Sequence, residues 1–234
     1  MHEIIPAIMP RNLTDVADKV SLIVSKVSTV QLDIMDGGFV PAKTWPYRDG
    51  DRAFLLKLLA EETGLPHWEE IEYEFDLMVN NPEQLADELV RSGASRIIFH
   101  IETLRDPVFT IETLRSTYGS PHDHATGIEI GLAISIPTPL SALEPIISKI
   151  DVVQVMGIDP IGVQGATLHK DTLSRIRELR AKYEDLILSV DGGVNLKNAQ
   201  SLIDAGATRL VSGSAIFDSE NPHHSIDQFL SLIN

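Results

Sequence analysis

Eight short, β-branched apolar runs recur along the chain of 234 residues, each followed by an amphipathic helical stretch. The runs are apolar throughout more than alternating, which is typical of parallel strands that are covered on both faces. The expected strands are Glu3–Met9, Val30–Met35, Ile71–Met78, Arg96–His100, Ile128–Ser135, Asp151–Met156, Leu186–Val190 and Arg209–Ser212. Eight alternating units without a break in composition favour a single α/β domain over residues 1–234, a closed (β/α)8 TIM barrel. A doubly wound open sheet is the structural alternative.

Local signals mark where several of the helices begin and end. Asn81-Pro82-Glu83 is typical of a helix start, and Ser92-Gly93-Ala94 is typical of the end of that helix. Asn195–Asn198 and Ala205-Gly206-Ala207 bracket another helix in the same way. Leu173–Tyr183 carries apolar residues at helical spacing among charged ones, so it is expected to form a third.

Two segments interrupt this alternation. Val40–His67 is long, and we expect a helix around Arg52–Glu62 together with an extended loop. Ser116–Thr126 contains His122-Asp123-His124, which is either a metal clip or, far more commonly for such a sequence, a polar surface loop. His223-His224 is expected at the exposed start of a helix.

Composition excludes several classes of function. The formal net charge of −15 argues against nucleic-acid binding, which needs a basic surface. The chain has no cysteine, so disulfides, thiolate catalysis and Cys-type zinc sites are excluded. No apolar run approaches the ~18 residues of a membrane helix, and Met1-His2-Glu3-Ile4-Ile5-Pro6 lacks the basic start of a signal peptide, which fits a cytoplasmic protein without a membrane partner.

Acidic residues stand at the ends of several predicted strands, where a barrel of this type carries its reactive groups. Alternate residues of a strand share a face, so Gln31, Asp33 and Met35 are expected to point into the barrel together. Asp76 ends the third strand and Asp191 the seventh. Each aspartate alone fits a helix cap or a turn equally well. Together they predict three carboxylates converging on one cavity.

Glycines follow the last three predicted strands. An acidic protein is expected to hold phosphate with backbone N–H groups at glycine turns and helix N-termini, not with a lysine cluster. The fold commonly forms such a site from its last βα loops. The predicted phosphate-binding residues are Gly162, Gly165, Gly192, Gly193, Gly213 and Ser214.

Several motifs, in order along the chain, resemble the ribulose-phosphate 3-epimerase family. They are Leu32-Asp33-Ile34-Met35-Asp36-Gly37-Gly38-Phe39-Val40-Pro41, Leu77-Met78-Val79-Asn80-Asn81-Pro82, His100-Ile101-Glu102, Val155-Met156, Val190-Asp191-Gly192-Gly193-Val194 and Gly213-Ser214-Ala215-Ile216-Phe217. The resemblance implies a cytoplasmic ribulose-phosphate-binding barrel that forms a homo-oligomer. It also implies a phosphorylated ketose substrate and a divalent metal ion at the active site.

The family inverts the carbon next to a ketone through an enediolate, whose negative charge must be stabilised. The resemblance assigns the two acid–base roles to Asp33 and Asp191. It places further side chains in the substrate pocket, namely Ala7, Met35, Met78, His100 and Met156. The methionines could lie against the enediolate, although core packing alone would also explain them.

The positions that match the family's metal ligands are Gln31, Asp33, Asp76 and Asp191, so both ligand histidines of the family are replaced. Gly38 and the altered loop Pro160–Gly165 are further departures, and Ala7 replaces a serine of the family. A set of oxygen ligands suits Mg²⁺ or Mn²⁺ better than zinc. The alternative is that the metal is lost and Asp76 is protonated or paired with a neighbour.

Two functions follow from these features. The first is a ribulose-phosphate 3-epimerase-like isomerase that works through Asp33 and Asp191. The second is a divergent barrel that binds a sugar phosphate without epimerising it. The second strand has no Asp-x-Lys-x-x-Asp pattern and no lysine ends a predicted strand, which argues against a decarboxylase or Schiff-base aldolase of related barrels.

Overall fold

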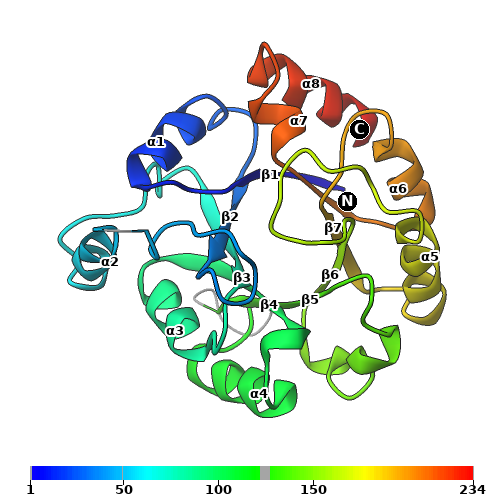
Figure 1. Ribbon diagram of the computed structural model, residues 1–234, viewed down its shortest axis with the longest axis horizontal. Helices are drawn as coiled ribbons and strands as arrows, with labels where there is room; N and C mark the ends of the chain where they lie inside the picture. Colours follow the sequence, from blue (N-terminus) through cyan, green and yellow to red (C-terminus); the bar gives the residue numbers. More distant parts are fainter. Residues whose placement is uncertain (1, 49, 122–126, 234) are drawn as a thin grey trace.

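A computed structural model describes residues 2–48, 50–121 and 127–233, and in it eight parallel strands close into a barrel in chain order (Figure 1). The strands are β1 (Glu3–Ile8), β2 (Thr29–Met35), β3 (Glu72–Met78), β4 (Ala94–His100), β5 (Glu129–Ile134), β6 (Val152–Met156), β7 (Ile187–Asp191) and β8 (Arg209–Ser212). The TIM barrel is confirmed, and the open sheet is wrong because β1 pairs with β8.

Helices surround the barrel. They are α1 (Leu13–Ser21), α2 (Arg52–Leu59), α3 (Glu83–Arg91), α4 (Pro107–Tyr118), α5 (Thr172–Lys182), α6 (Ala199–Ala205), α7 (Ser214–Phe217) and α8 (Pro222–Ile233), with 3₁₀ turns η1 (Ile101–Thr103), η2 (Leu140–Leu143) and η3 (Ile147–Lys149). The helix expected at Arg52–Glu62 forms but ends at Leu59. His223 and His224 are exposed at the start of α8, as predicted. None of the helices in the described ranges is long and apolar enough to cross a membrane.

The connection between β5 and β6 departs from the helical pattern. It contains the short turns η2 and η3 where the other connections between strands carry an α-helix. Pro137, Pro139 and Pro145 lie in this segment. Because proline has no N–H and its ring clashes with the preceding helical turn, a continuous helix cannot form across them.

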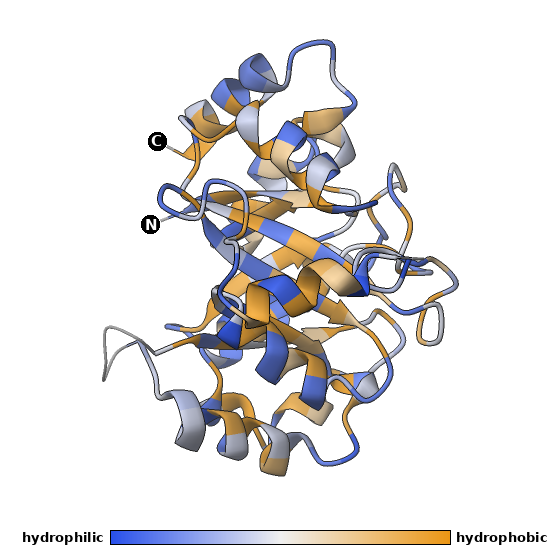
Figure 2. Cartoon of the chain, turned by 90° about the vertical axis from the view of Figure 1, so that its left-hand side faces the viewer, coloured by the Kyte–Doolittle hydropathy of each residue, from blue (hydrophilic) through white to orange (hydrophobic). Residues whose placement is uncertain are grey.

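Each strand contributes to two separate cores. In β2, Val30, Leu32 and Ile34 pack outward in the large core under the helices, while Met35 contacts Met78 inside the barrel mouth. Figure 2 shows the barrel strands largely in the colour of hydrophobic residues at the centre of the molecule. Because successive side chains point to opposite faces of a strand, every second residue points towards the barrel axis.

Charged residues fill the end of the barrel where the strands begin. Arg96 lies between Glu74 and Glu129, with nitrogen–oxygen distances of 2.5 Å to both carboxylates. Arg209 continues the chain of contacts, at 2.8 Å from Glu129 and 3.0 Å from Glu3. We call these five residues the ionic end of the barrel. Each of the two arginines is held by two glutamates.

The segment after β2 folds back onto that strand. The hydroxyl of Thr44 donates to the carbonyl of Asp33 at 2.7 Å and accepts from the backbone N–H of Met35 at 2.8 Å. Trp45 is fully buried beside it. These bonds fix the carboxyl end of β2, where the site described below begins. The histidine motif His122-Asp123-His124 lies outside the described residues.

Candidate functional site

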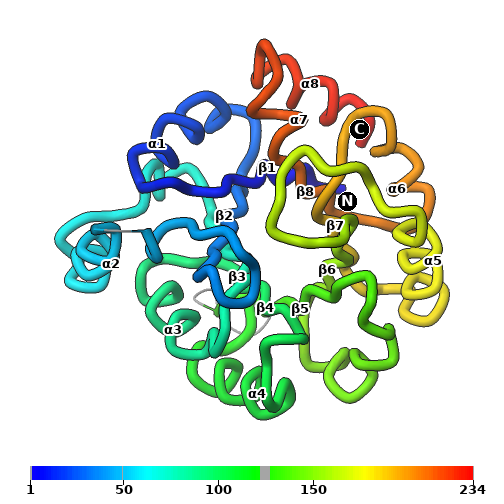
Figure 3. The backbone as a smooth tube through the Cα atoms, in the orientation of Figure 1, coloured from blue at the N-terminus to red at the C-terminus, as the bar shows by residue number. Residues whose placement is uncertain are grey.

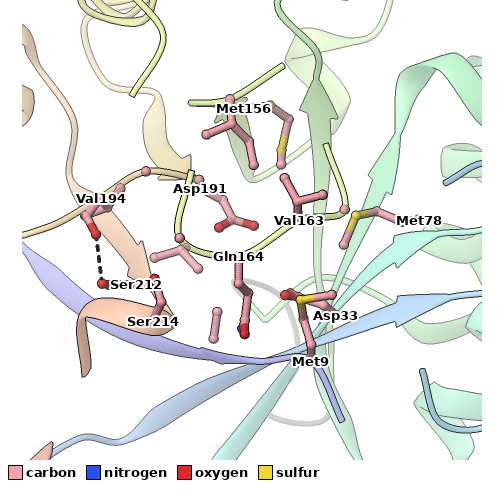
Figure 4. Close-up of a pocket in the computed structure, with 18 of the residues that line it drawn as sticks. Met9, Asp33, Met78, Met156, Val163, Gln164, Asp191, Val194, Ser212 and Ser214 are labelled. Atoms are coloured by element: carbon pink, nitrogen blue, oxygen red, sulfur yellow. Dashed lines mark hydrogen bonds between the residues drawn. The ribbon is translucent and has the colours of Figure 1, made fainter. Parts of the chain in front are cut away.

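A pocket lies at the carboxyl ends of the strands, and the connection from β6 to α5 curls over it (Figures 3 and 4). Many of the predicted site residues line it together: Ala7, Asp33, Met35, Met78, Met156, Gly162, Gly165, Asp191, Gly192, Gly193, Gly213 and Ser214. None of the described residues that line it is a lysine or an arginine. Three other predicted residues, Gln31, Asp76 and His100, do not line the pocket and are fully buried.

The three predicted aspartates converge. Asp33 and Asp76 are paired in register on the neighbouring strands β2 and β3, and Asp191 ends β7. One carboxylate oxygen from each lies within 4.8 Å of the others. Asp76 is completely buried, Asp33 is nearly so and Asp191 is partly exposed. In Figure 4, Asp33 and Asp191 face each other across the pocket.

Close packing of these carboxylates changes their acidity. Burial, reinforced by the charges of Asp191 and Asp76, raises the pKa of Asp33 well above its usual range. Burial and the charge of Asp76 likewise raise the pKa of Asp191, although the amide of Gln31 and the charge of His100 oppose the shift. The pKa of Asp191 is raised to about 7, so this group can exchange between the acid and base forms near neutral pH.

The amide of Gln31 takes the place that the resemblance gave to a ligand histidine. Its Nε2 donates to Asp33 at 2.7 Å and to Asp191 at 2.9 Å, so one amide bridges the two predicted acid–base groups. Its Oε1 is buried without a hydrogen-bond partner among the described residues. A buried amide oxygen of this kind is a potential ligand for a cation.

His100 compensates part of the charge. Its Nε2 lies 3.1 Å from Asp76, and its Nδ1 lies 3.7 Å from Glu102. Burial lowers the pKa of His100, but the charge of Asp76 and the contact with Glu102 outweigh it and raise the pKa to about 9. The predicted pocket residue His100 therefore pairs with Asp76 inside the barrel and does not line the pocket.

Sequence reasoning missed Gln154 and Ser189, which also lie inside the barrel. The Nε2 of Gln154 is 3.3 Å from Asp76 and 3.4 Å from Asp191, and its Oε1 accepts from the hydroxyl of Ser189 at 3.3 Å. The signal was present, because Gln154 is a polar residue within an otherwise apolar buried strand.

Glycines line the other end of the pocket. The backbone at Gly193 has a φ of +72°, and a side chain there would meet the backbone of Leu168. A Cβ on Gly213 would lie 2.9 Å from the carbonyl oxygen of Ala7 and 3.0 Å from Nε2 of Gln164. Gln164, another residue that sequence reasoning missed, thus reaches into this end from the connection that covers the pocket (Figure 4).

Comparisons with known proteins identify the family of the chain. The model of the ribulose-phosphate 3-epimerase family matches residues 3–217. The chain is 31% identical over 199 residues to a ribulose-phosphate 3-epimerase from Schizosaccharomyces pombe. The aligned segment covers 84% of this chain and 78% of the relative. It is 29% identical over 218 residues to the enzyme of that name from Escherichia coli K12, covering 92% and 88%.

Solved structures support the fold alone, because their sequence identity is low. A 3-hexulose-6-phosphate synthase from Salmonella typhimurium superposes with a TM-score of 0.72 at 13% identity, covering 99% of this chain and 98% of that one. A 3-keto-L-gulonate-6-phosphate decarboxylase from Vibrio cholerae gives 0.71 at 16%, covering 99% and 97%. By the match to the family model and the identity to its curated members, the chain belongs to the ribulose-phosphate 3-epimerase family.

Proposed function

We propose that the protein epimerises a ketose phosphate at the carbon next to the ketone. The observation that carries the proposal is the pair Asp33 and Asp191, which face each other across the pocket and share the amide of Gln31. Of all groups lining the pocket, these two carboxyls are suited to act on opposite faces of a bound carbon.

The reaction needs one carboxyl group in each protonation state. The carboxylate form of one aspartate removes the proton from the carbon, and the electron pair of that C–H bond enters the enediolate. The other aspartate, as the acid, donates its proton to the opposite face of the same carbon. The raised pKa values of Asp33 and Asp191 support this division, because one can hold a proton while the other does not.

The remaining residues bind and orient the substrate. The end of the pocket lined by Gly193, Gly213 and Ser214 suits a phosphate group, whose oxygens accept hydrogen bonds from exposed backbone N–H groups. Met35 and Met78 form the apolar wall at the mouth and exclude water from the reacting carbon. The absence of lysine and arginine from the described lining matches the phosphate recognition expected for an acidic protein.

The donor set fits a hard divalent cation, Mg²⁺ or Mn²⁺, better than zinc. Oxygens of Asp33, Asp76 and Asp191 lie within 4.8 Å of one another, and Gln31 Oε1 has no hydrogen-bond partner among the described residues. The three carboxylates would hold the ion, and Gln31 would join them through Oε1 once its amide turned over, because its Nε2 now faces Asp33 and Asp191. When bound, it would stabilise the negative charge that develops on the substrate oxygens.

Proton exchange with solvent tests the proposal. The protein is incubated with ribulose 5-phosphate in D₂O with Mn²⁺ supplied, and the carbon-bound proton next to the ketone is followed by NMR. We expect its signal to disappear, and we expect Asp33→Asn or Asp191→Asn to slow the loss by roughly 10²- to 10⁴-fold. The Asp18→Asn variant, which changes an exposed aspartate, is the matched control and should leave the rate unchanged.

The second candidate is a barrel that binds a sugar phosphate without epimerising it. The contact between His100 and Asp76 favours this second function. In that contact the imidazole occupies a carboxylate oxygen of Asp76, one of the positions that match the family's metal ligands. Binding of ribulose 5-phosphate by calorimetry without any proton exchange, from folded protein, would support this function and contradict the first.

A further inference from the structure

Gln154 is completely buried in β6, among Val152, Val153, Val155 and Met156. It does not line the pocket, so a substrate there is not its direct partner. Burying an amide costs free energy unless its hydrogen-bonding groups are satisfied. An apolar residue would suit this strand without that cost, so the partners of the amide indicate its role.

Those partners are two of the clustered carboxylates, the sulfur of Met156 at 3.9 Å and one hydroxyl. Nε2 of Gln154 lies 3.3 Å from Oδ2 of Asp76 and 3.4 Å from Oδ2 of Asp191. Ionised carboxylates only accept hydrogen bonds, so the NH₂ side of the amide has to face them. The amide thereby links the aspartates of β3 and β7 across the barrel interior.

Ser189 lies behind the amide. Its hydroxyl donates to Oε1 of Gln154 at 3.3 Å, and both side chains are buried. If the amide were flipped, Oε1 would face two carboxylates and the repulsion would be uncompensated. The hydroxyl of Ser189 therefore favours the orientation in which Gln154 donates to the aspartates.

The same oxygen of Asp191 accepts from two amides. Gln31 donates to Oδ2 of Asp191 at 2.9 Å, from the side of β2, and Gln154 approaches that oxygen from β6. Holding Oδ2 from two strands restricts rotation of the carboxyl group, and so fixes where its other oxygen, Oδ1, lies relative to the pocket that Asp191 lines. Proton transfer requires the acting oxygen to lie within hydrogen-bond reach of the carbon-bound proton, so a small misplacement slows it strongly.

We propose that Gln154 is a positioning residue that aims the carboxyl group of Asp191, and that Ser189 acts through it by fixing the amide. The inference rests on the proposed acid–base role of Asp191.

The test compares Gln154→Leu, Ser189→Ala and the double variant with the wild type in the deuterium-exchange assay. Gln154→Leu should lower kcat by about tenfold, with KM changed by less than about twofold, since a lost hydrogen bond acts on an aspartate and not on the substrate. Ser189→Ala should lower kcat by a smaller factor. The double variant should be no slower than Gln154→Leu, because Ser189 acts only through the amide.

Val153→Ala is the matched control, since Val153 lies on the same strand but packs outward in the core under the helices. It should reduce stability without lowering kcat. A crystal structure of Gln154→Leu supplies a readout that does not depend on activity, and it should show the carboxyl group of Asp191 rotated or in two orientations.

The outcomes separate the two proposals. Wild-type protein without proton exchange overturns the proposed function, and the crystal structure of the variant then decides the placement of Asp191 by itself. An unmoved Asp191 in Gln154→Leu overturns the positioning role. So does an unchanged kcat in an active protein, or additive effects of the two substitutions.

Discussion

Each end of the barrel interior holds three acidic groups, but the two ends treat them in opposite ways. At the ionic end, Arg96 and Arg209 each lie between two glutamates. At the pocket end, Asp33, Asp76 and Asp191 have one buried imidazole and two amides as their partners. Charges at the first end are compensated within the protein, whereas those at the second are left available for a ligand, a cation or a shared proton.

Breaking the ionic end should give the largest change in stability. Arg96→Met leaves the buried Glu74 and the partly buried Glu129 with one fewer cation, and we expect a loss of about 3–5 kcal/mol in the free energy of unfolding. Urea denaturation followed by circular dichroism measures it. The double variant Arg96→Met with Glu74→Leu should recover much of the loss, and equal losses in the single and double variants would contradict the pairing.

Removing a charge from the pocket end should have the opposite sign. Asp33→Asn takes away one of three clustered carboxylates while keeping a polar side chain of the same size, so we expect a gain of about 2 kcal/mol at pH 8 without added metal. The same denaturation experiment measures the gain. Asp18→Asn on the surface should change stability by less than about 0.5 kcal/mol; a loss of stability in Asp33→Asn would show that the cluster is already compensated.

The two ends should also respond to opposite changes of pH. Arg209 and Arg96 outweigh burial and lower the pKa of Glu129 to about 2, so its contribution is present at neutral pH and is lost as the pH falls from about 4.5 towards 2. Asp33 and Asp191 have raised pKa values, so their contribution is present in acid and is lost as the pH rises through those values.

His100 adds to the alkaline loss, because its contribution is complete below its ordinary pKa of about 6.5 and disappears through about 9. We expect metal-free protein to lose about 1.5 kcal/mol between pH 5.5 and 8.5, measured from urea midpoints. Asp33→Asn should flatten this dependence. An equally steep curve in that variant would assign the pH dependence to other groups.

The smallest expected effect concerns metal preference. Introducing imidazoles with Gln31→His and Asp76→His replaces two of the proposed oxygen ligands by nitrogen, and should raise the affinity for Zn²⁺ relative to Mn²⁺ by about fivefold. Competition titration calorimetry measures the ratio. An unchanged ratio would indicate that these two positions do not contact the ion.

Sequence predicted the barrel well because its signal is local and repeated. The alternation of apolar strands and helical spacing gave β2 and β8 nearly to the residue. The positions of Asp33, Asp76 and Asp191 at predicted strand ends also predicted that they lie together, since the strand ends of a parallel barrel meet at the same edge.

Contacts that depend on three-dimensional packing could not be predicted in the same way. Predicting the pairing of His100 with Asp76 requires knowing where each side chain lies inside the barrel. Gln154 belongs to none of the recognised motifs. Its hydrogen-bond partners are known only once β6 is paired with β7 in the closed barrel. The position of Gln164 depends on the path of a long connection whose sequence has no periodic pattern.

The alternation of inward and outward residues along β2 has a consequence for how such a protein can evolve. The side chains at positions 31, 33 and 35 lie at the candidate site, and those at positions 30, 32 and 34 pack under the helices. Substitutions at the first set can therefore exchange one chemistry for another while the scaffold persists. A single-residue insertion or deletion within the strand would move both sets to the opposite faces at once, so the strand tolerates replacements but not a change of its length.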